Sequence, residues 1–211
     1  MSKIRIEFFH DVICSFCFPM SYRMRQLKAQ FPELEIVHRS FALVKEVRDF
    51  DDMFGSRERA KAEVLGHWVH ANQNDDYHRF NIDGMRKADF PFPESMLGLR
   101  ACKAASKVAG EAGYWDVFDG LQEAFFMKSQ NIGDMTIIEQ VVKSTQVDFE
   151  EWKRYFEDPA TLLAVEDDLM LARDYRITSV PTLIINGTKR IIGAQGLDAI
   201  IAAVKNPDQP F

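Results

Sequence analysis

The sequence predicts an α/β fold in which one sheet is assembled from both ends of the chain around a large all-helical insertion. Residues 1–44 have the pattern of a strand–helix–strand unit, and a strand pattern returns only near residue 181, as a hairpin before a closing helix. The chain between is rich in helical signals and poor in β-branched runs. The simplest arrangement places residues 1–44 and 160–211 in one α/β domain and residues 45–159 in an inserted helical domain.

The composition is that of an ordinary globular protein. Of 211 residues, 46% are hydrophobic and 27% are charged, which fits one domain or one domain with a large insertion. The net charge of −6 argues against nucleic-acid binding, which needs clustered lysine and arginine. The sequence has neither a signal-peptide pattern nor an apolar run long enough to span a bilayer. We therefore expect a cytoplasmic protein that binds neither nucleic acid nor membrane, and we predict no oligomeric state.

The first elements are predicted to form a βαβ unit. Residues 3–9 place apolar side chains on one side with the period of two that is typical of a strand. A loop over residues 10–13 leads to a cysteine pair, and a helix is expected over residues 15–30. Residues 34–41 are predicted to form the second strand. Because crossovers in such units are right-handed, the two strands should be parallel.

The inserted segment is predicted to consist of helices. Ser56 can cap a helix that runs to about residue 75, whereas two prolines exclude regular structure from residues 89–93. Further helices are expected at residues 94–110, 114–128, 134–144 and 148–156.

The C-terminal elements are a helix, a hairpin and a closing helix. The helix that follows Asp158-Pro159 should bury an apolar stripe, formed by Leu162, Val165, Leu169 and Ala172. The hairpin has its strands at 181–185 and 190–192 and its turn at Asn186-Gly187. A helix is expected over residues 196–204, followed by a frayed tail at 206–211.

Cys14 and Cys17 form a C-x-x-C pair at the predicted strand-to-helix junction. At a helix start, positions i and i+3 share a face, and the unpaired N–H groups favour a thiolate. We expect Cys14 to be the exposed nucleophile that attacks a disulfide and Cys17 to be the buried thiol that resolves the mixed disulfide. The alternatives are an unreactive pair and half of a zinc site, to which His67 and His70 could contribute. We predict no metal.

Several residues near the cysteines are candidates for supporting roles. We expect Ser15 and Phe16, which lie between the cysteines, to contact the substrate. His10 and Asp11 could tune the ionisation of Cys14, and Asp11 could relay protons; loop packing and a solvated acid are the alternatives. Cys102 is expected to be a small structural residue, with regulation by oxidation as its alternative.

The segment Ser179-Val180-Pro181-Thr182 lies directly before the predicted hairpin. It resembles the segment of the thioredoxin superfamily that carries a cis-proline facing the C-x-x-C motif. The resemblance implies a cis Val180–Pro181 bond and a substrate contact at Val180 and Pro181. The sequence itself indicates only that this proline opens a strand, where its missing donor is tolerated.

The closer resemblance is to the DsbA family, a thioredoxin-like fold with a helical insertion, and within it to the cytosolic FrnE-like branch. Its motifs occur in the expected order over nearly the whole chain, at residues 11–18, 99–101, 131–134, 180–182 and 193–195. The resemblance implies a protein-disulfide oxidoreductase or isomerase that acts on protein or small-molecule disulfides. The redox-active Cys14–Cys17 disulfide would serve it in place of a bound cofactor.

The residues between the cysteines depart from the family pattern. Ser15-Phe16 stands where the branch commonly has Pro-Trp and periplasmic DsbA has Pro-His, so a strongly oxidising potential is less expected. The related kappa-class transferases and hydroxychromene-carboxylate isomerases use glutathione and carry serine at the position of Cys14. A glutathione-dependent isomerase or transferase, with glutathione as co-substrate, is therefore the alternative function. A binding module with an idle dithiol is the third hypothesis.

Overall fold

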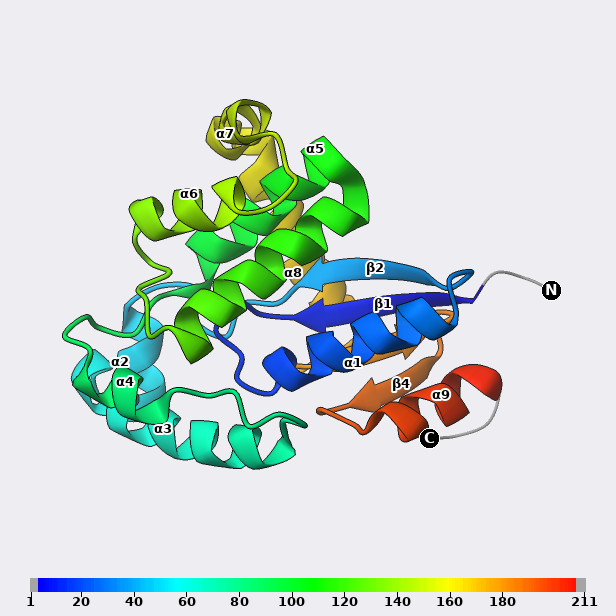
Figure 1. Ribbon diagram of the computed structural model, residues 1–211, viewed down its shortest axis with the longest axis horizontal. Helices are drawn as coiled ribbons and strands as arrows, with labels where there is room; N and C mark the ends of the chain where they lie inside the picture. Colours follow the sequence, from blue (N-terminus) through cyan, green and yellow to red (C-terminus); the bar gives the residue numbers. More distant parts are fainter. Residues whose placement is uncertain (1–3, 208–211) are drawn as a thin grey trace.

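The protein has one mixed sheet, and the two strands from the N-terminal end of the chain lie side by side in it (Figure 1). The computed structural model describes residues 4–207, and within them the strand order is β2-β1-β3-β4. β1 (Arg5–His10) and β2 (Glu35–Ser40) are parallel and are joined by α1 (Cys17–Gln30). The βαβ unit predicted from the sequence is therefore confirmed.

The C-terminal hairpin completes this sheet. β3 (Thr182–Ile185) pairs antiparallel with β1, and β4 (Lys189–Ile192) pairs antiparallel with β3. α9 (Leu197–Lys205) follows. Both ends of the chain thus contribute to one sheet. The predicted frayed tail lies outside the described residues from position 208 onward.

The chain between β2 and β3 is helical. Its elements are α2 (Arg48–Phe54), α3 (Arg57–Asn74), α4 (Ile82–Lys87), α5 (Ser95–Gln122), the π-helical turn η1 (Glu123–Met127), α6 (Met135–Lys143), α7 (Phe149–Glu157) and α8 (Pro159–Asp174). Five helix starts have side-chain caps of the types that the sequence favours. Their capping residues each accept a hydrogen bond from a backbone N–H of the first turn, and they are Ser56, Asn81, Asp134, Asp148 and Asp158. Within residues 4–207, no helix has both the length and the apolar character needed to cross a membrane.

The predicted helices at 94–110 and 114–128 are arranged differently from the expectation. The chain passes from one to the other within α5, through a kink at Ala109 (φ −131°) and Gly110 (φ +63°), and it ends in the π-helical turn. Glycine adopts the positive φ of position 110 without a steric penalty, so the helix changes direction there and resumes.

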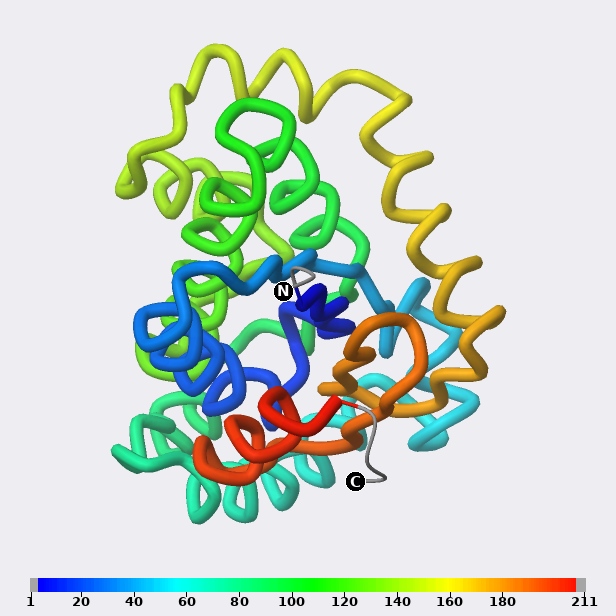
Figure 2. The backbone as a smooth tube through the Cα atoms, turned by 90° about the vertical axis from the view of Figure 1, so that its right-hand side faces the viewer, coloured from blue at the N-terminus to red at the C-terminus, as the bar shows by residue number. Residues whose placement is uncertain are grey.

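The two faces of β1 are both buried. Ile6 and Phe8 belong to the main core, whereas Phe9 packs in a smaller cluster with Ala172 of α8. α8 runs along the opposite side of β1 from α1 (Figure 2). Glu7 on that side is also buried, and it accepts hydrogen bonds from Arg39 at 2.7 and 2.9 Å.

The apolar stripe predicted for α8 is only partly correct. Val165 and Ala172 are buried, but Leu162 is 38% exposed. Asp168 is buried on this side of α8. It accepts a hydrogen bond from Ser40 N at 2.7 Å and forms ion pairs with Arg39 and Lys103. These partners on β2 and α5 neutralise the carboxylate, which offsets the cost of burying it.

Candidate active site

The two cysteines lie where β1 leads into α1. Cys17 is the first residue of α1, and its backbone N–H donates to Cys14 Sγ at 3.2 Å and to the Cys14 carbonyl at 3.1 Å. Cys14, Cys17 and Cys102 are all free thiols. The prediction of a buried Cys17 is confirmed, since it is 0% exposed. Cys14 differs from the exposed nucleophile expected, because it is only 4% exposed.

The surroundings distinguish the two sulfurs electrostatically. Cys14 Sγ receives a backbone N–H at the positive end of a helix, and such contacts stabilise a thiolate. Burial raises the pKa of Cys17, and its interactions with Cys14 and the charge of Asp11 raise it further. Cys17 therefore tends to keep its proton while it stays buried.

The structure brings Val180 to Cys14 from the far end of the chain. The Cys14 thiol donates to the Val180 carbonyl at 3.5 Å. The Val180–Pro181 bond is cis, the conformation that the resemblance implies. Pro181 itself leads into β3, and its carbonyl accepts a hydrogen bond from Gly193 N at 2.8 Å.

Asp11 is fully buried beside the cysteine turn, so the alternative of a solvated loop acid is wrong. Its carboxylate accepts hydrogen bonds from Ser95 Oγ at 2.6 Å, from Leu43 N at 2.7 Å and from Ile13 N at 3.4 Å. Burial raises the pKa of Asp11 to about 6, and these hydrogen bonds limit the rise. Asp11 therefore changes protonation state at mildly acidic pH, and it is mostly ionised in neutral solution.

His10 lies in β1 rather than in a loop, and its surroundings are not the cysteines. Its Nε2 lies 2.9 Å from His38 Nδ1, and its ring packs against Phe8, Tyr114 and Phe118. Burial is the main cause that lowers the pKa of His10 well below its ordinary value. The alternative of packing describes this residue better than direct tuning of Cys14.

Gln122 is a site residue that sequence reasoning missed. It is fully buried near the end of α5, and its amide Nε2 donates to the carbonyls of Asp11 and Cys14, at 3.3 Å each. It therefore ties α5 to the cysteine turn. The available signal was a polar residue at helical spacing from Phe118 and Phe125, on the face that those aromatic side chains bury.

A cavity of about 280 Å³ lies beside Cys14, and we call it the Cys14 pocket. Cys14, Ser15, Phe16 and Val180 line one side of it. The helical segment supplies most of the rest, with Phe50, Met53 and Phe54 on α2 and Val64 and His67 on α3. The structure thus gathers four of the predicted site residues at one cavity, whereas Cys17 and Pro181 lie outside its lining.

The histidines considered for zinc separate in the structure. His67 lines the Cys14 pocket, and His70 does not. Among residues 4–207, no three His, Cys, Asp or Glu side chains are grouped as a metal site. Cys102 is buried in α5, and burial raises its pKa well above the ordinary value.

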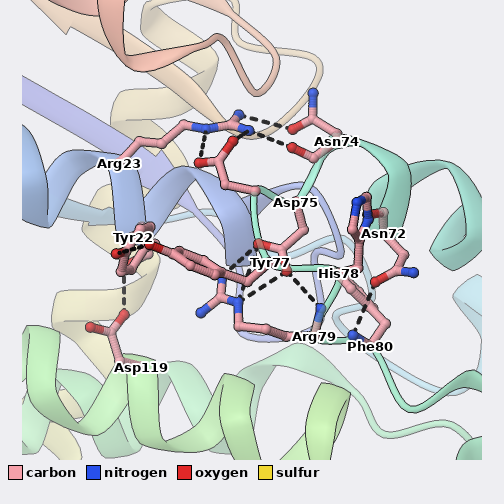
Figure 3. A network of polar contacts seen from close by, with 12 residues as sticks. Tyr22, Arg23, Asn72, Asn74, Asp75, Tyr77, His78, Arg79, Phe80 and Asp119 are labelled. Atoms are coloured by element: carbon pink, nitrogen blue, oxygen red, sulfur yellow. Dashed lines mark hydrogen bonds and ion pairs between the residues drawn. The ribbon is translucent and has the colours of Figure 1, made fainter.

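A polar network attaches the end of α3 to α1 (Figure 3). α3 also supplies Val64 and His67 to the pocket lining. Arg23 of α1 is buried, and its guanidinium donates to Asn74 Oδ1 at 2.9 Å and to Asp76 at 2.8 and 3.0 Å. Tyr22 and Tyr77 are joined through their hydroxyl groups at 3.0 Å. α3 is thereby fixed relative to the helix that begins at Cys17.

A family model described as a DSBA-like thioredoxin domain matches residues 5–205. Among curated proteins, the ClpXP adapter protein SpxH of Bacillus licheniformis is 31% identical over 103 residues, which are 49% of this chain and 34% of that protein. The matched region thus spans about a third of the length of that relative.

Solved structures resemble this one over nearly their whole length. The cytosolic disulfide reductase DsbM of Pseudomonas aeruginosa has a TM-score of 0.73 and 14% identity, with 96% of this chain and 98% of that chain covered. The same enzyme with GSH has a TM-score of 0.69 and 13% identity, covering 97% and 94%. A 2-hydroxychromene-2-carboxylate isomerase has a TM-score of 0.67 and 13% identity, covering 96% and 95%. At these identities the likeness concerns the fold.

Proposed function

The chain belongs to the DSBA-like thioredoxin domain family, and from this premise we propose that it is an enzyme that exchanges thiols and disulfides through Cys14 and Cys17. The observation that carries the proposal is the contrast between the two sulfurs. Cys14 accepts the first N–H of α1 at 3.2 Å and lines a pocket, whereas Cys17 is fully buried and does not line that pocket. This is the arrangement that a nucleophile and a resolving thiol require.

The proposed reaction has two displacement steps. The Cys14 thiolate attacks one sulfur of a substrate disulfide, so that a Cys14–substrate bond forms and the other substrate sulfur leaves as a thiolate. Cys17 then loses its proton and attacks the Cys14 sulfur, which forms the Cys14–Cys17 disulfide and releases the second substrate thiol. The protein gives up two electrons and the substrate accepts them.

Asp11 supports the second step of this proposal. The Cys17 thiol must lose its proton before it attacks, and its raised pKa makes that loss costly. Asp11 is a buried carboxyl group with a pKa of about 6, and its charge acts on Cys17. An ionised Asp11 is therefore our candidate acceptor for that proton.

We propose a cytoplasmic role for the chain, with protein or small-molecule disulfides as substrates and no bound cofactor. Ser15, Phe16 and Val180 would contact the substrate, since they line the same pocket as Cys14, and Pro181 would fix Val180 there. The absence of a histidine between the cysteines makes a strongly oxidising potential less expected. The resemblance of the sequence motifs to the FrnE-like branch supports this combination of compartment and substrates.

An insulin-reduction assay with dithiothreitol tests the proposal. We expect Cys14→Ser to abolish the activity and Cys17→Ala to accumulate a mixed disulfide with the substrate, visible by intact-protein mass spectrometry. Cys102→Ala is the matched control, because Cys102 is also a buried free thiol but lies in α5. Full activity in Cys14→Ser would overturn the mechanism.

Glutathione-dependent isomerisation or transfer is the second candidate function. It is supported by the shared fold with the hydroxychromene-carboxylate isomerase and by a cavity at Cys14. It predicts saturable binding of glutathione and activity that survives in Cys17→Ala. Loss of all activity in that variant would count against it.

A further inference from the structure

Cys14 is nearly inaccessible to solvent. Only 4% of this residue is exposed, and it lines the Cys14 pocket. A substrate disulfide that meets Cys14 must therefore approach through that pocket. The chemistry of the pocket walls consequently acts on whatever is attached to the attacked sulfur.

The walls are apolar and offer little to a charged group. Among the described residues, no lysine or arginine lines the pocket, and its titratable side chains are Cys14 and His67. A carboxylate placed there would lose its hydration without gaining a cationic partner, and such a transfer is costly. An aromatic or aliphatic group would instead be removed from water against Phe50, Phe54 and Val64.

The volume limits the size of the occupant. A dry cavity of about 150 Å³ accommodates a benzene molecule, whereas sites for whole drug-sized ligands span about 300–1,000 Å³. The Cys14 pocket, at about 280 Å³, therefore has room for one bulky side chain, and its lining without lysine or arginine gives a charged tripeptide such as glutathione no cationic partner.

The rim extends the apolar surface beyond the pocket. Leu43 and Met53, which line it, are 39% and 49% exposed. Large apolar side chains that gather around a reactive group indicate a surface for a partner. A polypeptide can cover this rim while one of its side chains fills the pocket, and a free small molecule cannot.

We propose that the Cys14 pocket selects polypeptide disulfides in which a bulky apolar residue, preferably aromatic, adjoins the attacked half-cystine. The inference rests on the proposed function, since it names the substrate class of the same site. The covalent step is the first displacement described above: the Cys14–substrate bond forms, the substrate disulfide breaks and its other sulfur leaves as a thiolate.

A chromogenic exchange assay tests the selection directly. The Cys17→Ala variant is mixed with peptides that differ at one position and are otherwise uncharged. Their single cysteine carries 2-nitro-5-thiobenzoate as a mixed disulfide, and attack by Cys14 with release of the dye is followed by absorbance. The residue beside that cysteine is phenylalanine, alanine or aspartate, and glutathione labelled in the same way is a fourth substrate. We expect the phenylalanine peptide to react about 10- to 100-fold faster than the alanine peptide, and the aspartate peptide and labelled glutathione to react more slowly still.

Variants of the rim separate pocket recognition from thiol reactivity. Met53→Lys, combined with Cys17→Ala, should reduce the phenylalanine-to-alanine rate ratio and raise the relative rate of the aspartate peptide. Leu163→Lys is the matched control, since Leu163 is 63% exposed on α8, and it should leave the ratios unchanged. Ratios are informative here because a change in Cys14 reactivity affects all substrates alike.

In this assay a failure of the proposed selection and a failure of the proposed function give different results. Equal rates for all peptides, or a preference for aspartate or labelled glutathione, would overturn the selection while leaving thiol–disulfide exchange intact. If no substrate released the dye although Cys14 could be titrated in unfolded protein, the proposed function itself would be wrong.

Discussion

At the scale of single residues, the candidate site depends on buried groups whose neighbours come from distant parts of the chain. Cys14 and Cys17 could be identified from four consecutive residues, because the motif is local. Asp11 was a candidate on proximity alone, and only the contacts with Ser95 and Leu43 reveal that it is a buried carboxyl group. The pocket residues Phe50 and Met53 gave no local signal, since their place beside Cys14 results from long-range packing.

The two polar side-chain atoms of Gln122 have opposite effects on the free energy of unfolding, so the effect of replacing this residue can be predicted. Nε2 makes two long hydrogen bonds, while Oε1 is buried without a hydrogen-bond partner among the described residues. Each such bond contributes about 1 kcal/mol, and an unsatisfied buried acceptor costs about 1–3 kcal/mol. Gln122→Met removes both effects, so we expect the free energy of unfolding to change by less than about 1 kcal/mol.

The same variant should slow the reaction of Cys14. Without the amide, the Asp11 and Cys14 carbonyls lose a donor, which leaves more negative potential beside the sulfur and disfavours the thiolate. We expect alkylation by iodoacetamide at pH 7 to slow about threefold. Because a tenfold change corresponds to about 1.4 kcal/mol, this is a loss of about 0.7 kcal/mol. Gln195→Met, which removes an amide bonded to the Ile192 carbonyl, is the control. An unchanged alkylation rate would refute the prediction.

At the scale of elements, starts were easier to predict than ends. Helix starts can be predicted from their capping residues, because a side-chain cap acts within the first turn. Examples are Ser56, Asp134 and Asp148. The continuation of α5 past Gly110 and its π-helical end depend on packing around Phe125 and Phe126, which a local pattern does not encode.

The cap of α3 supports a prediction at this scale. Ser56 Oγ accepts a hydrogen bond from Arg59 N at 3.2 Å, so Ser56→Ala should lower the free energy of unfolding by about 1 kcal/mol. Ser56→Asp retains an acceptor at this position and should preserve stability. The midpoint of urea unfolding, at an unchanged m-value, measures both. Equal destabilisation by alanine and aspartate would show that the cap is not the cause.

At the scale of the whole molecule, the sheet joins the two ends of the chain. Each local part, the βαβ unit and the hairpin, was predictable from periodicity and from the Asn186-Gly187 turn. The antiparallel pairing of β1 with β3 links residues 173 to 179 positions apart, from Phe9 with Thr182 to Ile6 with Ile185. No spacing in the sequence specifies that register. Burial of both faces of β1 determines it, because a shift by one residue would exchange the faces.

The buried pair of His10 and His38 makes the free energy of unfolding depend on pH. Burial lowers the pKa of His38 to about 3 and that of His10 well below its ordinary value. In the unfolded chain both rings should titrate near 6.5. Above that pH both rings are neutral in the folded and in the unfolded chain, so the stability contributed by the buried neutral pair is fully present. Below it the unfolded state binds more protons, and the contribution is lost as the pH falls toward the folded pKa values.

We therefore expect the free energy of unfolding to fall below pH 6.5 by up to about 1.4 kcal/mol per pH unit for each histidine. Asp11 acts in the opposite direction between about pH 6 and 4, because its pKa is raised in the folded state, so a wild-type curve alone is not decisive. The difference between wild type and the double variant His10→Phe/His38→Phe isolates the pair. Urea unfolding at pH 7.5, 6 and 5 should give a steeper decline for wild type, whatever the variant's stability at pH 7.5. Parallel curves would mean that the two rings are protonated equally in the folded and unfolded states, contrary to their position between β1, β2 and the aromatic face of α5.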